Sequence, residues 1–267
     1  MKYIKNIKIY DTEYTKKRLG PNKDGGYVVL DELCKKCDIL YSYGISDDVS
    51  FELDFLSNNP NTKVRLFDHT IENLPANHNN FYFLKEGISF EKQPNLNTLE
   101  NHLKYYGDLN RSNKILKIDV EWNEWNVFEQ MHDNILSQFD QIFCEFHFIP
   151  VIYNGSNSPY FTKFNKFVYG EINNLLFKKY QNVLEKICEH YHIFHLHINN
   201  SLALNEIDGQ TFPPLLEISF VNKSLIKNPI LIKQKFPIQN LDFPNKNYKE
   251  DIIDFDWNRF YEYIVFL

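Results

Sequence analysis

Hydrophobic residues recur along the chain in short runs, and segments with helical spacing separate most of the early runs. Runs of this length, rich in β-branched and aromatic residues, predict strands. We expect seven strands, at residues 39–43, 63–68, 81–86, 115–120, 141–147, 193–198 and 215–221. Apolar positions at helical spacing predict helices at residues 49–57, 96–106, 122–137 and 161–191. Because alternating strands and helices favour parallel pairing, we predict an α/β fold whose mostly parallel sheet is flanked by helices.

Two segments fall outside this pattern. Residues 18–30, RLGPNKDGGYVVL, carry Gly-Pro and Gly-Gly turn signals that predict a turn or hairpin before the core. After Val221 the chain is rich in Lys, Asn and Pro, and it closes with an aromatic segment in which we expect a short helix. We therefore expect an N-terminal turn or helical extension packed on the core (1–38), a core domain (39–221) and a C-terminal tail (222–267). The aromatic residues of the tail need a surface, either the body of the protein or the second subunit of a homodimer.

The composition narrows the class of protein. The chain has 267 residues, of which 43% are hydrophobic and 16% aromatic, so a sizeable core is expected and disorder is not. A formal net charge of -6 argues against nucleic acid as the main partner. The sequence contains no run of eighteen apolar residues, and its N-terminus lacks the apolar core of a signal peptide, so we expect a cytoplasmic protein without membrane insertion.

The four cysteines suggest no special chemistry. They are too few and too irregularly spaced for a disulfide framework. Cys34 and Cys37 form a C-x-x-C, but the two further ligands of a zinc site and the context of a thioredoxin-like redox pair are both missing. We therefore expect reduced thiols on a helix.

A candidate ligand site follows the first predicted core strand. Residues 41–56, YSYGISDDVSFELDFL, indicate a strand, a turn at Gly44 and a helix, the arrangement in which a ligand approaches backbone near a helix N-terminus. Only one glycine is present, and Asp47 and Asp48 would repel a pyrophosphate. A positively charged ligand without phosphates fits better. The alternative is an ordinary turn with an Asp cap.

Asp68, at the end of the second predicted strand, adds to this picture. An acidic residue at that place can accept hydrogen bonds from both hydroxyls of a ribose. Together with the Gly44 turn it indicates an adenosine-type ligand. Adenosine that lacks phosphates and is attached to a cation describes S-adenosylmethionine.

The ordered segments DGGYVVL, YGISDDVSFE, LFDHT, LKIDVEWNEWNVF and CEFH resemble the FkbM-type branch of the class I S-adenosylmethionine-dependent methyltransferases. HLHINN and PPLLEISFV look like the C-terminal strands of that branch, so the resemblance spans about residues 18–221. It implies a Rossmann-like, seven-stranded sheet and methyl transfer to a hydroxyl oxygen. In its most specific segment, LKIDVEWNEW, Trp122 stands where the family usually has glycine.

The resemblance also implies where the methyl donor binds. Asp119 and Glu121 follow the fourth strand, and they would face donor and acceptor. Glu124 and Trp125 would begin the returning helix, where an early acidic residue suits the helix dipole. Glu121 has an alternative as a strand-end carboxylate paired with Arg or Lys. The expected donor contacts are Asp24, Gly25, Tyr43, Gly44, Ile45, Asp68, His69, Ile88, Asp119 and Glu121.

CEFHFIP, residues 144–150, supplies a candidate general base. Glu145 and His147 alternate along one strand, so both side chains share a face. Methyl transfer to an alcohol requires the hydroxyl to lose its proton, and a histidine oriented by a carboxylate is suited to take it. We expect His147 as the base, with Asp119 or Glu145 orienting it. A strand-end histidine that only stabilises the fold is the alternative. The same three residues could also gather Mg²⁺ or Mn²⁺, although no contiguous metal motif supports this.

Two further segments can line the site. HLHINN places His197 and Asn199 on one strand face, where they could form the acceptor pocket or simply bond to backbone. Trp122 and other aromatic residues offer stacking surfaces for a sugar, although most rings in so aromatic a chain belong to the core. In the early turn, Asp24, Gly25 and Gly26 could fold over the amino-acid end of the donor or form a plain hairpin turn.

The sequence therefore predicts an S-adenosylmethionine-dependent O-methyltransferase, with S-adenosylhomocysteine as its product. The acceptor that the resemblance implies is a saccharide or nucleotide-linked hydroxyl, used in the assembly of a surface polysaccharide. One alternative keeps the reaction with a phosphoryl-type or other small-molecule oxygen as acceptor. Another is a binding protein that keeps the fold without turnover.

Overall fold

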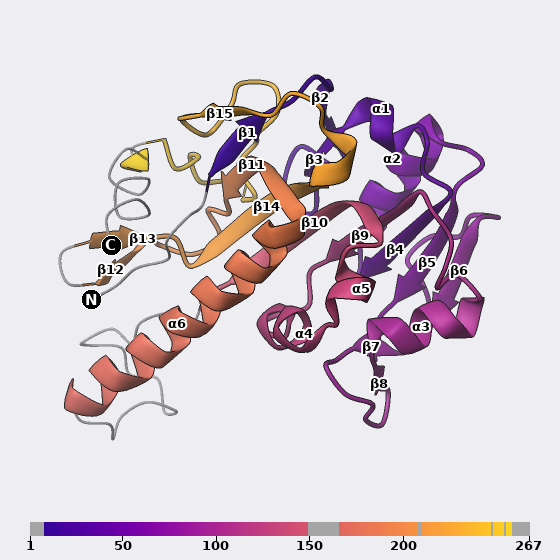
Figure 1. Cartoon of the computed structure of the whole chain (residues 1–267), viewed down its shortest axis with the longest axis horizontal. Coiled ribbons are helices and arrows are strands. Elements are labelled where there is room, and N and C mark those ends of the chain that lie inside the picture. The colour runs from indigo at the N-terminus through magenta and orange to yellow at the C-terminus, as the bar shows by residue number, and fades with distance from the viewer. Residues whose placement is uncertain (1–7, 149–165, 208–209, 247, 254, 258–267) are drawn as a thin grey trace.

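The computed structural model describes residues 8–148, 166–207, 210–246, 248–253 and 255–257. Its main element is a nine-stranded sheet (Figure 1). The strands lie in the order β15 (Ile230–Ile232), β1 (Ile9–Asp11), β11 (Tyr191–Ile198), β14 (Leu215–Asn222), β10 (Phe139–His147), β9 (Lys114–Ile118), β4 (Ile39–Tyr43), β5 (Lys63–Phe67) and β6 (Phe81–Leu84). All seven predicted strands are present, so the prediction of a mostly parallel sheet in an α/β fold is confirmed.

The predicted number of seven strands is wrong, because two short strands extend one edge. Ile9 of β1 pairs in parallel with Ile193 of β11, and β15 pairs antiparallel with β1 on its outer side. Each of these strands has only three residues. A run that short gives too few alternating positions to be recognised in the sequence. Such a strand forms because it packs against its partner strand, which the local sequence does not show.

Strand direction places the ends of the central strands together. β9, β4, β5 and β6 run parallel, and β10 is parallel to β9. β14 lies antiparallel between β10 and β11. The carboxyl ends of β4, β5, β9 and β10 therefore meet at one edge of the sheet, the edge at which open α/β sheets bind ligands.

Helices cover both faces of this sheet. One face carries α3 (Leu99–Tyr106), α4 (Glu124–Gln130), α5 (Asp133–Leu136) and α6 (Lys166–His190), which contribute to one hydrophobic cluster. The other face carries α1 (Asp31–Cys34), α2 (Ser50–Asn58) and the hairpin of β2 (Lys16–Leu19) and β3 (Tyr27–Leu30). The Gly-Gly turn signals therefore correctly predicted a hairpin.

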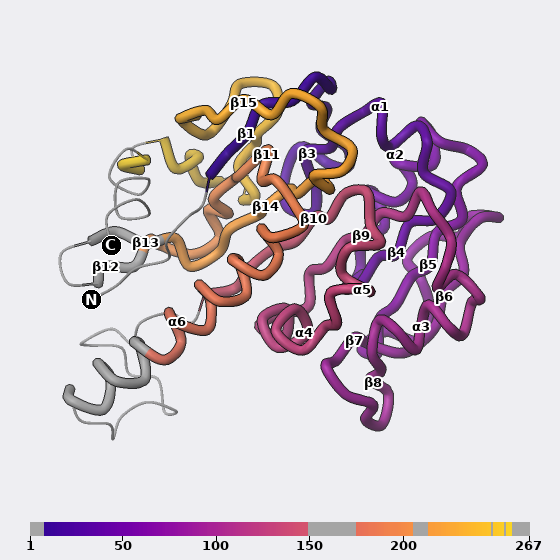
Figure 2. Tube along the Cα trace, viewed as in Figure 1, coloured from indigo at the N-terminus to yellow at the C-terminus, as the bar shows by residue number. Residues whose placement is uncertain are grey.

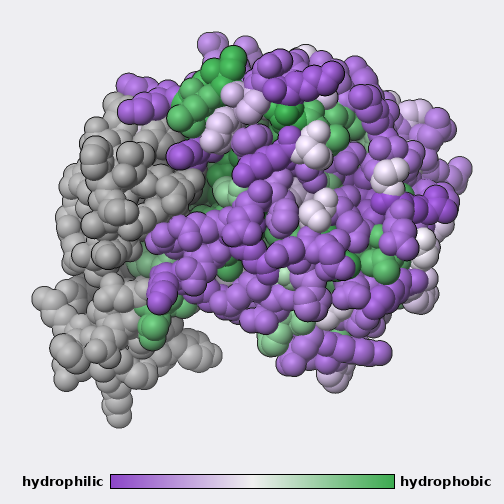
Figure 3. Space-filling model, viewed as in Figure 1, coloured by the Kyte–Doolittle hydropathy of each residue, from purple (hydrophilic) through white to green (hydrophobic). Residues whose placement is uncertain are grey.

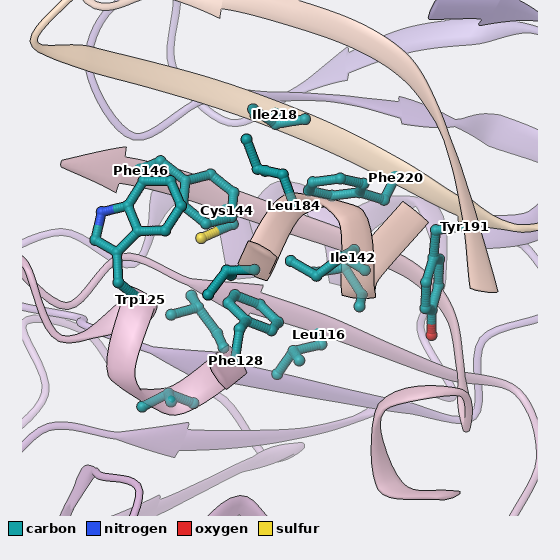
Figure 4. Close-up of a cluster of buried hydrophobic side chains, with 14 of the residues drawn as sticks. Leu116, Trp125, Phe128, Ile142, Cys144, Phe146, Leu184, Tyr191, Ile218 and Phe220 are labelled. Carbon is teal, nitrogen blue, oxygen red and sulfur yellow. The ribbon is translucent and has the colours of Figure 1, made fainter. Parts of the chain in front are cut away.

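The helix α6 shows why the sequence pattern works where it is long. Its buried residues Tyr180, Val183, Leu184 and Ile187 recur at helical spacing. Leu184 meets Ile218 and Phe220 of the sheet in the cluster around α4 (Figure 4). In Figure 2 the coloured part of α6 runs toward β10 and β14 and lies beside α4. Residues 161–165 of the predicted helix lie outside the described residues.

Two predicted helices have different bounds in the structure. Residues 96–106 begin with strand β8 (Leu96–Asn97), which pairs with β7 (Gly87–Ile88), and Thr98 then caps α3 by accepting from Asn101 N. Residues 122–137 form α4 and α5, because Met131 and His132 take extended ψ angles of 129° and 142° between them. In both cases the apolar periodicity continues through residues whose backbone is not helical. The periodicity alone could therefore not show where the helix begins or is interrupted.

The remaining elements are small. β12 (Asn205–Ile207) and β13 (Gln210–Phe212) form a two-stranded sheet, and η1 (Lys223–Leu225) follows β14. The helix expected near the C-terminus falls mostly on residues outside the described ones. No helix in the described part of the chain has the length and hydrophobicity needed to cross a bilayer.

Candidate functional site

Two cavities lie at the carboxyl edge of the sheet. The first, here the Lys117 cavity, measures about 490 Å³ and is lined by residues including Asp24, Gly25, Ile45, Phe51, Glu52 and Lys117. The second, here the Asp68 cavity, measures about 550 Å³ and is lined by residues including Asp68, His69, Thr70, Ile88, Ser89 and Asn123. Both are also lined by Gly44, Ser46, Asp119 and Glu121, so they adjoin along these residues. Each has the volume typical of a small-molecule site.

The Gly44 turn separates the two cavities and requires glycine. Gly44 has a φ of 78°, and a Cβ at this position would overlap the carbonyl oxygen of Asp119. Its N–H donates to the carbonyl of Phe67 at 3.1 Å. The turn is thus held between the ends of β5 and β9, and bare backbone faces the site there.

Asp68 holds this turn from the other side. Its Oδ2 accepts from Ile45 N at 2.9 Å and Ser46 N at 2.8 Å, and its Oδ1 accepts from the N–H and the hydroxyl of Thr70. Burial opposes the charge, but these hydrogen bonds outweigh it and lower the pKa of the carboxyl. Since four protein donors already occupy the carboxylate, a ribose would have to share or replace the Thr70 contacts. The predicted ribose contact stays a prediction.

The backbone after β9 is in an unusual conformation. Glu121 and Trp122 have φ angles of 48° and 78°, in the left-handed region that favours glycine. This explains the glycine that the resembling family has at the place of Trp122. The Trp122 ring lies 5.6 Å from the His147 ring, at a surface position. Strain of this kind is typical of functional sites.

The candidate base His147, at the end of β10, is held by the start of α4. Glu124 Oε1 accepts from His147 N at 2.6 Å and lies 3.1 Å from His147 Nδ1. Trp125 Nε1 donates to the carbonyl of His147 at 2.7 Å. The carboxylate that orients His147 is therefore Glu124. The expectation of Asp119 or Glu145 was wrong, because strand β10 directs its last residue toward the first turn of α4.

The other nitrogen of His147 faces Glu121. Nε2 lies 3.2 Å from Glu121 Oε2, whose side chain is 79% exposed. Burial lowers the pKa of His147, but the contacts with Glu121 and Glu124 outweigh it and raise this pKa to about 11. Neither cavity is lined by His147 itself, whereas Glu121 lines both. Glu121 thus stands between the histidine and the cavities.

Asp119 lies where the two cavities adjoin. Burial raises the pKa of its carboxyl to about 6, and Lys117 and His147 limit the rise. Its Oδ2 accepts from the hydroxyl of Tyr27 at 3.4 Å. The prediction that Asp119 faces a ligand is therefore consistent with its position, although its role remains a prediction.

Glu145 belongs to a second group of carboxylates. It faces Glu217 across the β10–β14 pair, and both group with Asp24. Asn199 donates to Glu145 Oε1 at 2.6 Å, and Asn245 donates to Glu217 Oε1 at 2.6 Å. Burial, reinforced by Asp119 and Glu217, raises the pKa of Glu145 well above its usual value. Glu145 is thus separate from the His147 pair in its hydrogen bonding.

Three other predicted site residues lie away from the cavity walls. Tyr43 is buried in the core, where it stacks on Phe67 at 4.5 Å and meets His102 Nδ1. The Tyr43 side chain thus packs in the core, and the predicted role of Tyr43 in donor binding stays a prediction. His197 lies between Glu217 and Asp251. Asn199 contacts Asp24 and Glu145. The side chains of His197 and Asn199 thus contact other residues of the site and do not line either cavity.

Three residues of the site escaped the sequence analysis. Glu52 and Lys117 line the Lys117 cavity, and Glu124 holds His147. Glu52 and Glu124 lie near helix starts, where an acidic residue is commonplace, so their types alone gave no signal. Lys117 did give a signal in the sequence, because a lysine inside an apolar strand is rarely buried without a partner.

At the candidate site, two groups of side chains could hold a divalent cation. Asp119, Glu121 and His147 bring ligand atoms within 4.8 Å of one another, and so do Asp24, Glu145 and Glu217. Oxygen-rich sets of this kind suit Mg²⁺ or Mn²⁺. The expected set of Asp119, Glu145 and His147 is divided between the two groups.

Comparison with solved structures finds slight likenesses to methyltransferases. A protein assigned as an rRNA methylase from Clostridium thermocellum has a TM-score of 0.33 and 10% identity, covering 72% of this chain and 92% of its own. One assigned as a caffeoyl-CoA O-methyltransferase from Staphylococcus aureus has a TM-score of 0.33 and 13% identity, covering 72% and 79%. TM-scores this low add nothing to the fold described above. No curated protein matches the sequence.

The sequence itself gives the decisive comparison. The family model described as "Methyltransferase domain" matches residues 2–195, which is more than half of the chain. The match includes the Gly44 turn, Asp68, Asp119 and the β10 strand that ends at His147. The methyl donor implied by this family is S-adenosylmethionine. The chain belongs to the methyltransferase-domain family, and it is an S-adenosylmethionine-dependent methyltransferase.

Proposed function

We propose that this enzyme is an FkbM-type O-methyltransferase that methylates a hydroxyl oxygen of a sugar or glycan-linked acceptor. The observation that carries the proposal is the His147–Glu124 pair beside the two cavities. It combines a histidine, an orienting carboxylate and an adjoining space for donor and acceptor. This is the set of groups that proton removal from an alcohol requires.

The cavities fit S-adenosylmethionine. The donor lacks phosphates, which suits a turn with one glycine and two aspartates, Asp47 and Asp48. Its sulfur is positively charged, and Asp119 and Glu121 lie where the two cavities adjoin. When bound, the donor supplies a methyl group on a sulfonium that leaves as a neutral thioether.

Glu124 fixes the role of each nitrogen of His147. Because Glu124 Oε1 accepts from Nδ1, the proton of the neutral imidazole stays on Nδ1 and Nε2 carries the lone pair. We propose that the acceptor hydroxyl replaces Glu121 at Nε2. Loss of the Glu121 contact lowers the pKa of His147, so that Nε2 can take the hydroxyl proton as the oxygen is methylated. The remaining acceleration comes from alignment of the two reactants.

The surroundings of His147 are consistent with a sugar as the acceptor. Trp122 offers an exposed ring beside His147, a suitable stacking surface for a sugar.

Turnover and binding together test the proposal. The purified enzyme should bind S-adenosylhomocysteine in a calorimeter and consume S-adenosylmethionine with at least one member of a panel of sugars and nucleotide-linked sugars. His147→Gln should lower kcat by about 10²- to 10⁴-fold. Because His147 does not line the cavities, the variant should bind S-adenosylhomocysteine as the wild type does. The exposed His78→Gln serves as the control.

The other outcomes separate the alternatives. No heat with S-adenosylhomocysteine contradicts donor binding. Binding without transfer to any hydroxyl, carboxyl or phosphoryl acceptor identifies a binding protein instead of an enzyme. Full turnover by His147→Gln contradicts the assignment of the base.

A further inference from the structure

Glu52 carries a buried carboxylate oxygen with no partner. The residue lies in the first turn of α2, lines the Lys117 cavity and is 1% exposed. Its Oε1 accepts from Ser42 Oγ at 2.5 Å and lies 3.6 Å from Lys117 Nζ. Its Oε2 has no hydrogen-bond partner among the residues that the structure describes. A buried carboxylate oxygen without a donor is costly, so it indicates a ligand that brings an N–H group.

Lys117 lies beside Glu52 and has an N–H donor available for a ligand. Lys117 Nζ donates to the carbonyl of Gly44 at 3.2 Å, and its side chain is only 6% exposed. An ammonium has three N–H donors, and the contacts with Gly44 and Glu52 account for two of them. The Lys117 cavity therefore offers a negative and a positive group a few ångströms apart, each able to bind one group more.

This pair complements an α-amino acid. A zwitterion carries an ammonium and a carboxylate separated by one carbon atom, and it requires an acceptor and a donor at a matching separation. We propose that Glu52 Oε2 binds the α-ammonium of the methionine part of the donor and that Lys117 Nζ binds its α-carboxylate. The proposal rests on the donor binding that the proposed function requires.

The assignment orients the donor in the cleft. Its amino-acid end lies in the Lys117 cavity, and its adenosine lies in the Asp68 cavity with His69 and Ile88. Asp24, expected at the amino-acid end, also lines the Lys117 cavity, where it contacts Asn199, Asn245 and Lys246. Glu52 and Lys117 therefore act as positioning residues that set where the methyl group is held.

Binding of two nucleosides tests the pair without turnover. S-adenosylhomocysteine has the amino-acid end, and 5′-methylthioadenosine lacks it. In calorimetry, Glu52→Gln and Lys117→Met should each weaken S-adenosylhomocysteine by about 10- to 100-fold, the loss expected for a hydrogen bond to a charged group. Both should bind 5′-methylthioadenosine as the wild type does. Glu72→Gln, a change of the same kind at an exposed position, should alter neither affinity.

Decarboxylated S-adenosylmethionine distinguishes the roles of Glu52 and Lys117. It keeps the ammonium and lacks the carboxylate, so Glu52→Gln should bind it more weakly than the wild type does, while Lys117→Met should bind it equally well. For the wild type, an S-adenosylhomocysteine analogue without the α-amino group should bind about 10-fold or more weakly. That comparison stands even when a variant fails to fold.

Each further result has a defined meaning. Unchanged binding of S-adenosylhomocysteine by Glu52→Gln overturns the proposal, and so does an equal loss for both nucleosides, which marks a structural role. Equal affinity of the wild type for the analogue without the amino group overturns it as well. A wild type that binds neither nucleoside contradicts the proposed function itself.

Discussion

Trp122 stores backbone strain beside the candidate base. Its φ of 78° is in the region where a residue with a Cβ is disfavoured by about 1–2 kcal/mol. The ring is one-third exposed and lies beside His147, so it gains little from burial. A strained residue next to the candidate base is expected to serve the substrate.

Replacement of Trp122 by glycine should stabilise the protein. Relief of the strain, less the larger flexibility of an unfolded glycine, leaves a gain of about 0.5–1 kcal/mol in the free energy of unfolding. Chemical denaturation measures it. Trp122→Ala keeps the Cβ and the strain, so it should show no such gain. A Trp122→Gly protein less stable than Trp122→Ala contradicts this explanation. Both variants should have a raised KM for the acceptor.

Glu121 sets the charge of His147, and its removal should shift the pH dependence of activity. The base works when neutral, so kcat/KM rises with pH through the pKa of His147. Burial lowers this pKa, and the hydrogen bonds to Glu121 and Glu124 raise it. Glu121→Gln should therefore move the acidic limb of the profile to lower pH. Glu72→Gln should leave the limb in place, and an unmoved limb in Glu121→Gln excludes His147 as the titrating base.

Among the elements, strand β11 connects the tail to the sheet through His197. Its ring lies between Glu217 of β14 and Asp251 of the tail. Burial disfavours the charged ring, but the two carboxylates outweigh it and raise the pKa of His197 to about 10. A pKa raised by folding gives stability that is present below the unfolded value near 6.5 and is lost as pH rises through 10.

Denaturation at several pH values checks this link. The free energy of unfolding should be higher for the wild type than for His197→Gln. This difference should be largest near pH 6 and should shrink toward pH 10. The matched change at the exposed His132 should give a small difference that does not vary in this way. A difference for His197 that grows with pH contradicts the charged ring.

The elements also show how far the sequence could lead. Long apolar runs such as residues 141–147 identified every central strand, because each contains enough positions for a period to appear. Strands β1 and β15 could not be found, since three residues carry no period. The Gly44 turn and Asp119 could be placed at one sheet edge. The Glu124 contact could not, because it depends on how α4 packs against β10.

At the scale of the molecule, acidic residues from distant parts of the chain gather at one edge. Asp24 comes from the turn between β2 and β3, Glu145 from β10 and Glu217 from β14. The described surface in view is mostly hydrophilic (Figure 3). Ile230 and Leu231 of edge strand β15 are more than half exposed, and they offer an apolar surface at which a homodimer could be sought.

Chelation tests whether this acidic edge needs a metal. His147 is oriented by Glu124, and Asn199 and Asn245 already donate to the Asp24, Glu145 and Glu217 group. After dialysis against EDTA, kcat should therefore stay within about 2-fold of its starting value. Loss of a catalytic ion would lower kcat far more, because such an ion stabilises the transition state by several kcal/mol. A loss that Mg²⁺ or Mn²⁺ restores contradicts this prediction.

The pairing of β1 with β11 and β15 affects how a newly made chain completes its sheet. Ile9 leaves the ribosome before its partners Ile193 and Ile232, which are synthesised some two hundred residues later. The N-terminal strand must therefore wait, unpaired, while the central strands assemble. Contacts between such distant parts of a chain form slowly. A nascent chain stopped before β11 should thus still expose its first strand to chaperones and proteases.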